Sequence, residues 1–501
     1  MNPGRILVLR NLTAAAAMLL LASCAVGPDF RAPDAPAASR YTENELPAQT
    51  ETAGVRGGEA QRFEAGAAIP ERWWELFRSE ALDKLVREAI ANSPSLEAAQ
   101  AALRQAQENL NAERSVLFPS VDAGLGAKRQ KTSGASFGLP NIPSNTFTLY
   151  NASVNVSYSI DLAGGARREL EALRAQIEFQ QFQIEAAYLA LTANVTTAAF
   201  QEASLRAQIQ ATREIIEAQE RQLQMVERQL ELGAVSRPDV LAQRAQLAQT
   251  RAGLPPLEKA LAQTRNQLAV LLGKLPSEAA LPELKPDAFE LPQTLPVSLP
   301  SELVRQRPDI RAAEATLHAA SAKIGVATAA KFPQISLSAS AGSAATKASD
   351  LFGAGTSLWS IGANLLQPIF HGGELQARER GAVAAYDLAF AQYRQTVLGA
   401  FQNVADVLQA LDGDAAALRA QAEAEGAARA SLETAESQYR LGATSQLTLL
   451  NAQRQYQQAR IGLVQAQALR YADTAALFQA LGGGWWRREA QPETASAGSS
   501  R

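Results

Sequence analysis

Apolar and polar residues alternate strictly along residues 150–161, which predicts a β-strand. The even positions are apolar or aromatic and the odd positions are polar: Tyr150, Ala152, Val154, Val156, Tyr158 and Ile160 against Asn151, Ser153, Asn155, Ser157, Ser159 and Asp161. A tilted strand crosses a bilayer with roughly 9–11 residues. A strand of a soluble β-sandwich alternates too, but the length and the small polar face favour a membrane strand.

The alternation recurs, and it predicts four strands, at about 119–131, 146–161, 333–345 and 356–370. Four strands cannot close a barrel, because closure takes about eight or more. Open strand edges are excluded from lipid, where no water is present to satisfy the backbone. The predicted fold is therefore an α+β membrane protein in which each chain supplies one sector of an oligomeric β-barrel, continuous with long helices.

Two very long helices are predicted, one after each pair of strands. Residues 166–232 contain neither Pro nor Gly, a run of 67 residues and roughly 100 Å of helix. The counterpart, 374–441, is interrupted only by glycines. We predict the helices at about 165–232 and 373–441, and their length is typical of coiled-coil-like packing rather than of a globular helix.

Each long helix is predicted to stop at a glycine, Gly233 or Gly442, because glycine adopts the left-handed conformation that ends a helix. A capping residue then starts a return helix in each half. The pair Pro255-Pro256 predicts a break in the first return helix, whereas the second has no proline there. The return helices are predicted at about 237–273 and 445–481.

The two halves are a tandem repeat. Phe118-Pro119 recurs as Phe332-Pro333 with an offset of 214 residues, whereas Gly233 and Gly442 are offset by 209. The five missing residues fall between the strand segments, as in a variable hairpin tip. The predicted organisation is a signal peptide (1–23), a lipidated N-terminal and equatorial segment (24–80), repeat 1 (81–275), a Pro-rich connector (276–300), repeat 2 (301–484) and a flexible tail (485–501).

The N-terminus has the pattern of a secretory signal. Arg5 and Arg10 precede an apolar run at 12–21 that is too short to span a membrane. Cys24, the only cysteine, follows small residues, so we predict that it carries a covalent lipid; an ordinary buried thiol is the alternative. Ala25 in the next position favours sorting to the outer membrane.

Composition and charge narrow the function. The residues are 47% hydrophobic but only 6% aromatic, which fits long helices with narrow apolar stripes. The net charge of −3 is no basis for expecting a nucleic-acid partner. His318 and His371 lack a ligand pattern, so we expect no metal, no cofactor beyond the lipid and no enzymatic site.

A short basic cluster, Lys128, Arg129 and Lys131, lies beside a predicted extracellular loop. A solvated turn is its simpler interpretation, and contact with the phosphates of lipopolysaccharide is the alternative.

Several motifs resemble the OprM/NodT branch of the TolC-like outer membrane factors: Cys24-Ala25-Val26-Gly27-Pro28, Trp73-Trp74 with Leu82, Asn92-Ser93-Pro94, the paired Leu-Gly-Ala turns, and Ala480-Leu481-Gly482-Gly483-Gly484-Trp485. The resemblance covers essentially the whole mature chain. It implies a homotrimer in the outer membrane, with a twelve-stranded barrel and a twelve-helix periplasmic tunnel. It also implies a periplasmic adaptor and an inner-membrane pump of the proton-driven RND type, in an efflux system for drugs and toxic compounds.

The resemblance places the gate and the adaptor contact at the periplasmic tip, in the turns at 232–240 and 441–450. The implied site residues are Gly233, Val235, Ser236, Arg237, Asp239, Gly442, Thr444, Gln446, Thr448 and Asn451.

Some relatives carry acidic residues at the positions of Thr448 and Asn451, and this chain has neither acid. Asp239 is the nearest carboxylate, and helix capping is its simpler interpretation. We therefore predict that closure depends on neutral packing and on hydrogen bonds among Arg237, Gln446 and Asn451.

Two other functions stay open at this point, a duct for protein secretion and a lipid-anchored coiled-coil tether. The Cys24 anchor and the OprM-like ends favour efflux over secretion. The alternating strands argue against a tether.

Overall fold

The computed structural model describes residues 25–133 and 143–488 and divides the chain into two units. The signal peptide and Cys24 lie outside the described residues. Helices α4 (Gly165–Glu231) and α9 (Glu374–Arg440) each begin in unit 1 and continue into unit 2. Unit 1 comprises residues 1–33, 101–181 and 312–394, and unit 2 comprises residues 34–100, 182–311 and 395–501.

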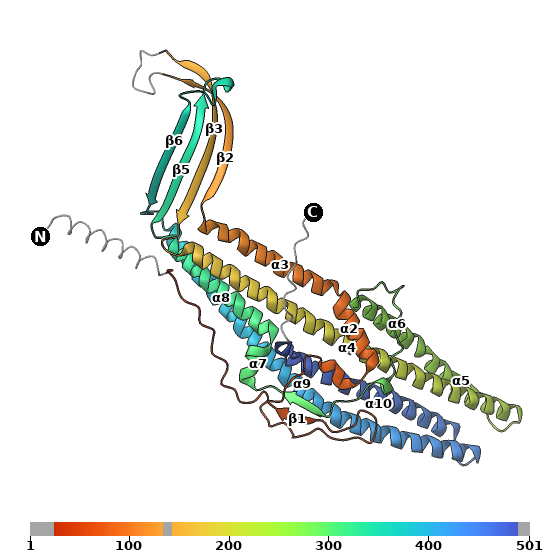
Figure 1. Ribbon diagram of the computed structural model, residues 1–501. Helices are drawn as coiled ribbons and strands as arrows, with labels where there is room; N and C mark the ends of the chain where they lie inside the picture. The colour runs from red at the N-terminus through yellow and green to blue at the C-terminus, as the bar shows by residue number, and fades with distance from the viewer. Residues whose placement is uncertain (1–24, 134–142, 489–501) are drawn as a thin grey trace. The chain divides into compact units, whose positions relative to one another are not determined.

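Unit 1 contains an antiparallel four-stranded sheet (Figure 1). Each repeat supplies one hairpin, and the pairing of β3 with β5 joins the two. The first three strands begin and end within one residue of the predicted bounds. The fourth, predicted to reach residue 370, ends at Leu366, because Pro368 has no N–H for a strand ladder. The strands, in sheet order, are β2 (Ser120–Thr132), β3 (Asn145–Ile160), β5 (Gln334–Ala345) and β6 (Ser357–Leu366).

The register places the apolar positions of all four strands on one face. Val154 lies opposite Ala123 on β2 and opposite Ala341 on β5, and Ala341 lies opposite Trp359 on β6. Directly opposed residues share a face, so the alternation seen in the sequence becomes one apolar face and one polar face. Leu125, on the apolar face, is 83% exposed, because none of the residues that the structure describes covers it. An uncovered apolar face of this size requires an apolar surrounding.

The helices follow the repeat. Copy one has α3 (Pro94–Arg114) before its strands and copy two has α8 (Pro308–Ala329). The first return helix is interrupted at Gly253, because Pro255 and Pro256 cannot donate to the preceding turn. The second continues without a break over 35 residues. Among the described residues, no helix combines the length and the hydropathy that a membrane span needs. The return helices are α5 (Arg237–Ala252), α6 (Leu254–Leu271) and α10 (Gln446–Ala480).

Unit 2 contains elements that the sequence patterns did not predict. Strand β1 (Arg62–Ala65) pairs in parallel with β4 (Thr294–Val297), so the N-terminal segment and the Pro-rich connector form a small sheet. Helices α2 (Glu80–Asn92) and α7 (Pro300–Gln306) lie at the start of the two repeats. The segment before Pro70 is therefore held by backbone pairing.

The tail boundary predicted at residue 485 is wrong for its first four residues. Residues Trp485–Arg487 form a 3-10 helix, η6. The Arg488 guanidinium lies 3.0 Å from Glu71 and 3.1 Å from Glu185, and it stacks over the Tyr188 ring. Residues 489–501 lie outside the described residues.

A buried polar cluster links these segments in unit 2. Arg470 on α10 is fully buried, and its Nη2 donates to Gln61 Oε1 at 2.9 Å and to the Glu59 carbonyl at 3.0 Å. Beside it, burial raises the pKa of the Asp414 carboxyl, and a hydrogen bond with Asp473 adds to this effect. Together they bring the pKa to about 7. The protonated form of Asp414 is thus the one that the fold favours.

We predict that Asp414→Asn raises stability increasingly between pH 4 and pH 7. The folded pKa lies above the unfolded value, so the stabilising protonated form is lost as pH rises through about 7, whereas Asn imitates that form at every pH. Thermal unfolding midpoints of the two proteins should coincide near pH 4 and diverge toward pH 8. Gln409→Ala, which replaces an exposed side chain that does not titrate on the same helix, is the control and should leave the pH dependence of the unfolding midpoint as in the wild type.

Candidate functional site

The two helix turns near the ends of α4 and α9 are nearly identical. Gly233 and Gly442 adopt φ of +73° and +70°. The N–H of Ala234 donates to the Gln229 carbonyl, and the N–H of Ala443 donates to that of Gln438, both at 2.8 Å. These are the bonds of a Schellman stop, which requires a left-handed residue. The predicted glycine stops therefore have the geometry expected of them.

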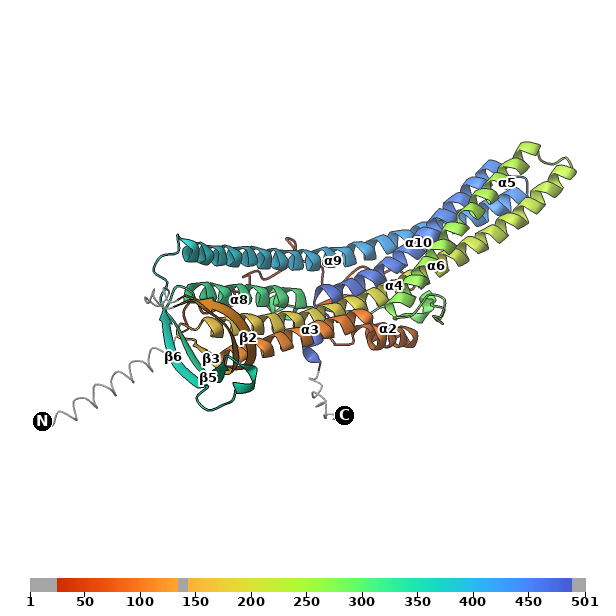
Figure 2. The ribbon, with the colours of Figure 1, turned by 90° about the horizontal axis from the view of Figure 1, so that it is seen from above.

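The four helix ends pack around one hydrophobic cluster, so the tip of unit 2 is a single packed element (Figure 2). Val235, between α4 and α5, packs against this cluster rather than projecting from it. Tyr439 adds a hydrogen bond from its hydroxyl to Gln229 Oε1 at 2.9 Å. The buried members are Val226, Val240, Ala435, Tyr439, Leu449 and Ala452.

Asp239 is engaged in capping α5. Its Oδ2 accepts from the Ser236 N–H at 2.9 Å and from the Ser236 hydroxyl at 2.5 Å. The Ser236 hydroxyl, followed by the Ser236 N–H, lowers the pKa of Asp239 below its ordinary value. The carboxylate is ionised at neutral pH and already has partners, as the capping interpretation requires.

Thr448 occupies the equivalent position in the second repeat, 209 residues after Asp239. The Ser445 hydroxyl accepts from the Thr448 N–H at 3.2 Å and lies 3.0 Å from the Thr448 hydroxyl. The same cap is thus built with a charge in copy one and without a charge in copy two.

The predicted hydrogen bonds among Arg237, Gln446 and Asn451 are not present between the described residues. Gln446 is buried, and its Nε2 donates to Gln243 Oε1 on α5 at 2.8 Å. Arg237 and Asn451 are exposed. Five residues separate Gln446 from Asn451, which turns the two side chains about 140° apart on one helix. Gln446 therefore faces α5 and Asn451 faces away from it.

Polar side chains join α5 to α10 along a seam that the sequence did not indicate. Beyond the Gln446 contact, Arg454 Nε donates to Gln246 Oε1 at 2.5 Å, and Thr250 Oγ1 lies 3.3 Å from Gln457 Oε1. No ion pair among the described residues crosses this seam. The seam is therefore held by neutral hydrogen bonds, beside the hydrophobic cluster to which both helices contribute.

A different seam joins α4 to α5 and α6. Three ion pairs lie one heptad apart along it, at 2.6–2.8 Å: Glu227 with Arg244, Glu220 with Arg251, and Arg213 with Glu258. The regular spacing is that of an antiparallel coiled coil. Each exposed pair contributes little alone, but together they specify the register of α4 against its return helices.

The segment that follows Cys24 is fastened within unit 1 by Arg168. The side chain is buried, and its Nε donates to the Val26 carbonyl at 3.1 Å. Its Nη2 reaches Asp29 Oδ1 at 2.8 Å and the Gly27 carbonyl at 3.3 Å. Its Nη1 donates to Glu171 at 2.8 Å. One arginine on α4 thus binds several consecutive groups of the N-terminal segment.

Two glycines allow this close seating. Gly27 has φ of +100°, and a Cβ there would lie 2.4 Å from Gly325 Cα on α8. The Val26 N–H donates to the Ala163 carbonyl at 3.0 Å. Residues 25–29 therefore lie on the surface of α4 and α8 with no room for a larger side chain at residue 27.

Each histidine lies beside a glutamate. His318 Nε2 lies 3.0 Å from Glu171 Oε1, and its ring stacks on Phe30 with centroids 4.4 Å apart. His371 is exposed beside Glu374. Within the described ranges, no group of three or more His, Cys, Asp or Glu side chains is placed to hold a metal.

Comparison with known proteins agrees with this fold. The family model of the outer membrane efflux protein matches residues 85–274 and 299–483. The antibiotic efflux pump outer membrane protein ArpC of Pseudomonas putida is 32% identical over 96% of both chains. The pyoverdine export outer membrane protein OpmQ of Pseudomonas aeruginosa is 34% identical over 83% of this chain and 87% of that one.

Solved structures agree as well. The outer-membrane channel OprN has a TM-score of 0.82 at 30% identity, over 92% of this chain and all of that one. The open state of the Neisseria gonorrhoeae MtrE channel has a TM-score of 0.77 at 28% identity, over 92% and 98%. The fold and the two repeats thus define an outer-membrane channel protein. The chain belongs to the outer membrane efflux protein family, as the resemblance indicated, and is the outer-membrane component of an efflux pump.

We predict that Arg168→Ala releases residues 25–33 from unit 1. The substitution leaves Asp29, Glu171 and the Val26 carbonyl without their cationic donor. Hydrogen exchange at the Val26 amide should accelerate by at least about tenfold, since each charged bond contributes about 1.5–3 kcal/mol. Lys323→Ala, which removes an exposed pair with Glu169, is the control. Unchanged exchange in Arg168→Ala would contradict the clamp.

We predict that Thr448→Asp makes the channel sensitive to divalent cations. The new carboxylate stands where Asp239 stands in copy one, beside Ser445, and the same cap keeps it ionised. Single-channel currents in planar bilayers should then fall when Mg²⁺ is added. Thr448→Asn keeps the shape without the charge and should behave like the wild type. A trace unaffected by Mg²⁺ in Thr448→Asp would mean that this position does not line the constriction.

Proposed function

We propose that three copies of the chain form a closed, passive exit duct for small molecules, working with a periplasmic adaptor and a proton-driven inner-membrane pump. The observation that carries the proposal is the open sheet of unit 1, with its apolar face uncovered and its edge strands β2 and β6 unpaired. A chain with this sheet is incomplete in lipid until other copies join it.

The edges support the oligomer. An unpaired edge strand exposes a row of N–H and C=O groups, each expensive to place in hydrocarbon. Pairing β6 of one copy with β2 of the next removes both edges and repeats the same contact around a ring. Three copies supply twelve strands, the number that the family resemblance implies, and this exceeds the minimum for a closed barrel.

The Arg168 clamp supports lipidation of Cys24. Residues 25–29, directly after the cysteine, are seated on α4 and α8, which keeps the attachment point of an acyl chain close to these helices. The lipid would add apolar attachment to a protein whose strands already cross the membrane. The described residues that follow Cys24, 25–33, belong to the same unit as the sheet.

The helix tip supports the gate and the adaptor contact. The neutral α5–α10 seam can open, while the ion pairs along α4 hold the other return helices in register. Arg237, Thr448 and Asn451 are exposed at the end of this element and are available to an adaptor, with Thr444 half-buried beside them. Energy for export comes from the partner pump, and an enzymatic step in this chain is not part of the proposal.

Relatives are named for the export of toluene, other solvents, antibiotics and pyoverdine. Their diversity supports a duct without a selective pocket. The polar face of the sheet carries Ser, Asn and Gly at opposed positions, such as Ser340 with Asn155, and suits water-filled passage rather than tight binding.

We predict that deleting the gene raises sensitivity to drugs and organic solvents several-fold and raises cell retention of a fluorescent pump substrate. The secreted proteome should stay unchanged, since the duct serves small molecules. A plasmid copy of the wild-type gene should restore export, and the purified protein should have the mass of three chains by light scattering in detergent.

Each of the two alternative functions predicts a different result in these measurements. Loss of secreted proteins with normal drug sensitivity would identify a secretion duct. A monomer whose deletion leaves dye retention unchanged would identify a lipid-anchored tether.

A further inference from the structure

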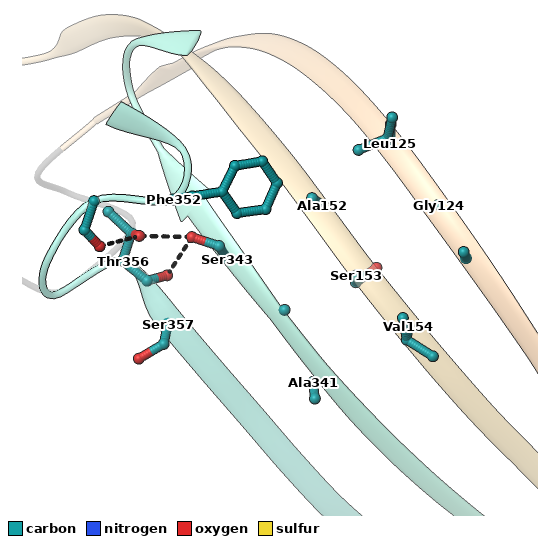
Figure 3. Close-up of a pocket in the computed structure, with 13 residues that line it drawn as sticks. Gly124, Leu125, Ala152, Ser153, Val154, Ala341, Ser343, Phe352, Thr356 and Ser357 are labelled. Carbon is teal, nitrogen blue, oxygen red and sulfur yellow. Dashed lines mark hydrogen bonds between the residues drawn. The ribbon is translucent and has the colours of Figure 1, made fainter. Parts of the chain in front are cut away.

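A cavity of about 710 Å³ opens at one end of the apolar face of the sheet (Figure 3). Its base is formed by β2, β3 and β5, where small side chains leave space above the sheet. The loop between β5 and β6 forms one side of the cavity. This volume lies in the range of sites for small organic molecules. Residues that line it include Leu125, Ala152, Val154, Ala341, Phe352 and Ser357.

The loop is pinned over the sheet by Ser343. The buried Ser343 hydroxyl lies 2.6 Å from Thr356 Oγ1 and within hydrogen-bond distance of the Leu351 and Thr356 carbonyls. Thr356 Oγ1 in turn donates to the Gly353 carbonyl at 2.9 Å. Ser343 lies opposite Ala152 in the register, so the loop folds onto the apolar face. Phe352, held in this loop, is 81% exposed.

The strand register also shows on which face of the sheet each residue of the basic cluster (Lys128, Arg129 and Lys131) lies. The sequence alone did not show this. Arg129 lies opposite Thr148, and Lys131 lies opposite Thr146. Both threonines occupy even positions of β3, like Ala152 and Val154, so Arg129 and Lys131 extend the apolar face. Lys128, opposite Leu149, lies on the other face.

The two cations stand just beyond the apolar stretch. Arg129 follows Leu125 by four residues, about 13 Å along the strand. Within the four described strands, the one carboxylate, Asp122, lies opposite Asn155 on the polar face. Lys347 and Asp350, in the loop that carries Phe352, have opposite charges. The end of the apolar face that carries Arg129 and Lys131 is therefore positively charged, and the apolar cavity lies on the same face.

We propose that this face binds one membrane lipid with a phosphate-bearing headgroup. Arg129 and Lys131 contact the phosphate, and an acyl chain lies in the cavity beneath Phe352. The inference rests on the proposed function, in which the sheet crosses the outer membrane. Charge complementarity selects an anionic lipid over a zwitterionic one, because cations at a membrane surface attract anionic headgroups. The exported substrate is not the occupant, since the cavity opens on the apolar face rather than on the polar one.

The test uses the full mature protein in detergent, titrated with dioleoylphosphatidylglycerol or dioleoylphosphatidylcholine, with bound lipid counted by native mass spectrometry. The wild type should retain phosphatidylglycerol in preference to phosphatidylcholine. Arg129→Glu with Lys131→Glu should weaken phosphatidylglycerol binding about tenfold or more, because two attractive charges at the headgroup become repulsive. Lys128→Glu, one residue away on the opposite face, is the matched control and should bind as the wild type does.

Phe352→Ala separates the chain contact from the headgroup contact. It should weaken binding of the dioleoyl lipid but not of dihexanoylphosphatidylglycerol, whose chains are too short to fill the cavity. The proposal fails if Lys128→Glu weakens binding as much as the double variant, if both headgroups bind equally, or if Phe352→Ala has no effect. Single-channel current of the double variant should match the wild type. Loss of lipid with normal current leaves the proposed function intact, whereas absence of current in the wild type refutes that function alone.

Discussion

The structure depends on one constraint, that a backbone N–H or C=O group in hydrocarbon must have a partner within the protein. The four-stranded sheet satisfies this rule between its strands and violates it at β2 and β6. Alternation of side chains then makes one face suited to lipid and the other to water. Because of both properties, several copies of the chain are needed to close a barrel of which one copy supplies a four-stranded sector.

The tandem repeat supplies equivalent helices and turns in the two halves of the chain. Some of these elements are nearly identical, and others differ. Both long helices end in the same glycine turn, because that turn depends on a left-handed residue and on nothing distant. The return helices differ: prolines interrupt one and the other is continuous. Asp239 and Thr448 cap equivalent helices with and without a charge. The four helices of the tip are thus not interchangeable, and of its two seams one is neutral and the other contains ion pairs.

Buried arginines hold the segments that lack a regular pattern. Arg168 binds the peptide after Cys24, and Arg470 holds the N-terminal segment through Gln61. An arginine suits this role, since its planar fork can donate to several carbonyl and carboxylate groups at once. Removing such a group from water is compensated only when its donors find acceptors.

The sequence by itself determined the strands, the long helices, their glycine stops and the break at Pro255, because each depends on residues close together in the chain. It also assigned Asp239 to a cap, three residues from its partner. Only the tertiary structure decided the order β2-β3-β5-β6, the pairing of β1 with β4, the Gln446–Gln243 contact and the face on which Arg129 lies. These join residues from distant segments or depend on strand register, and no local periodicity specifies which distant partner a backbone edge or a buried side chain will meet.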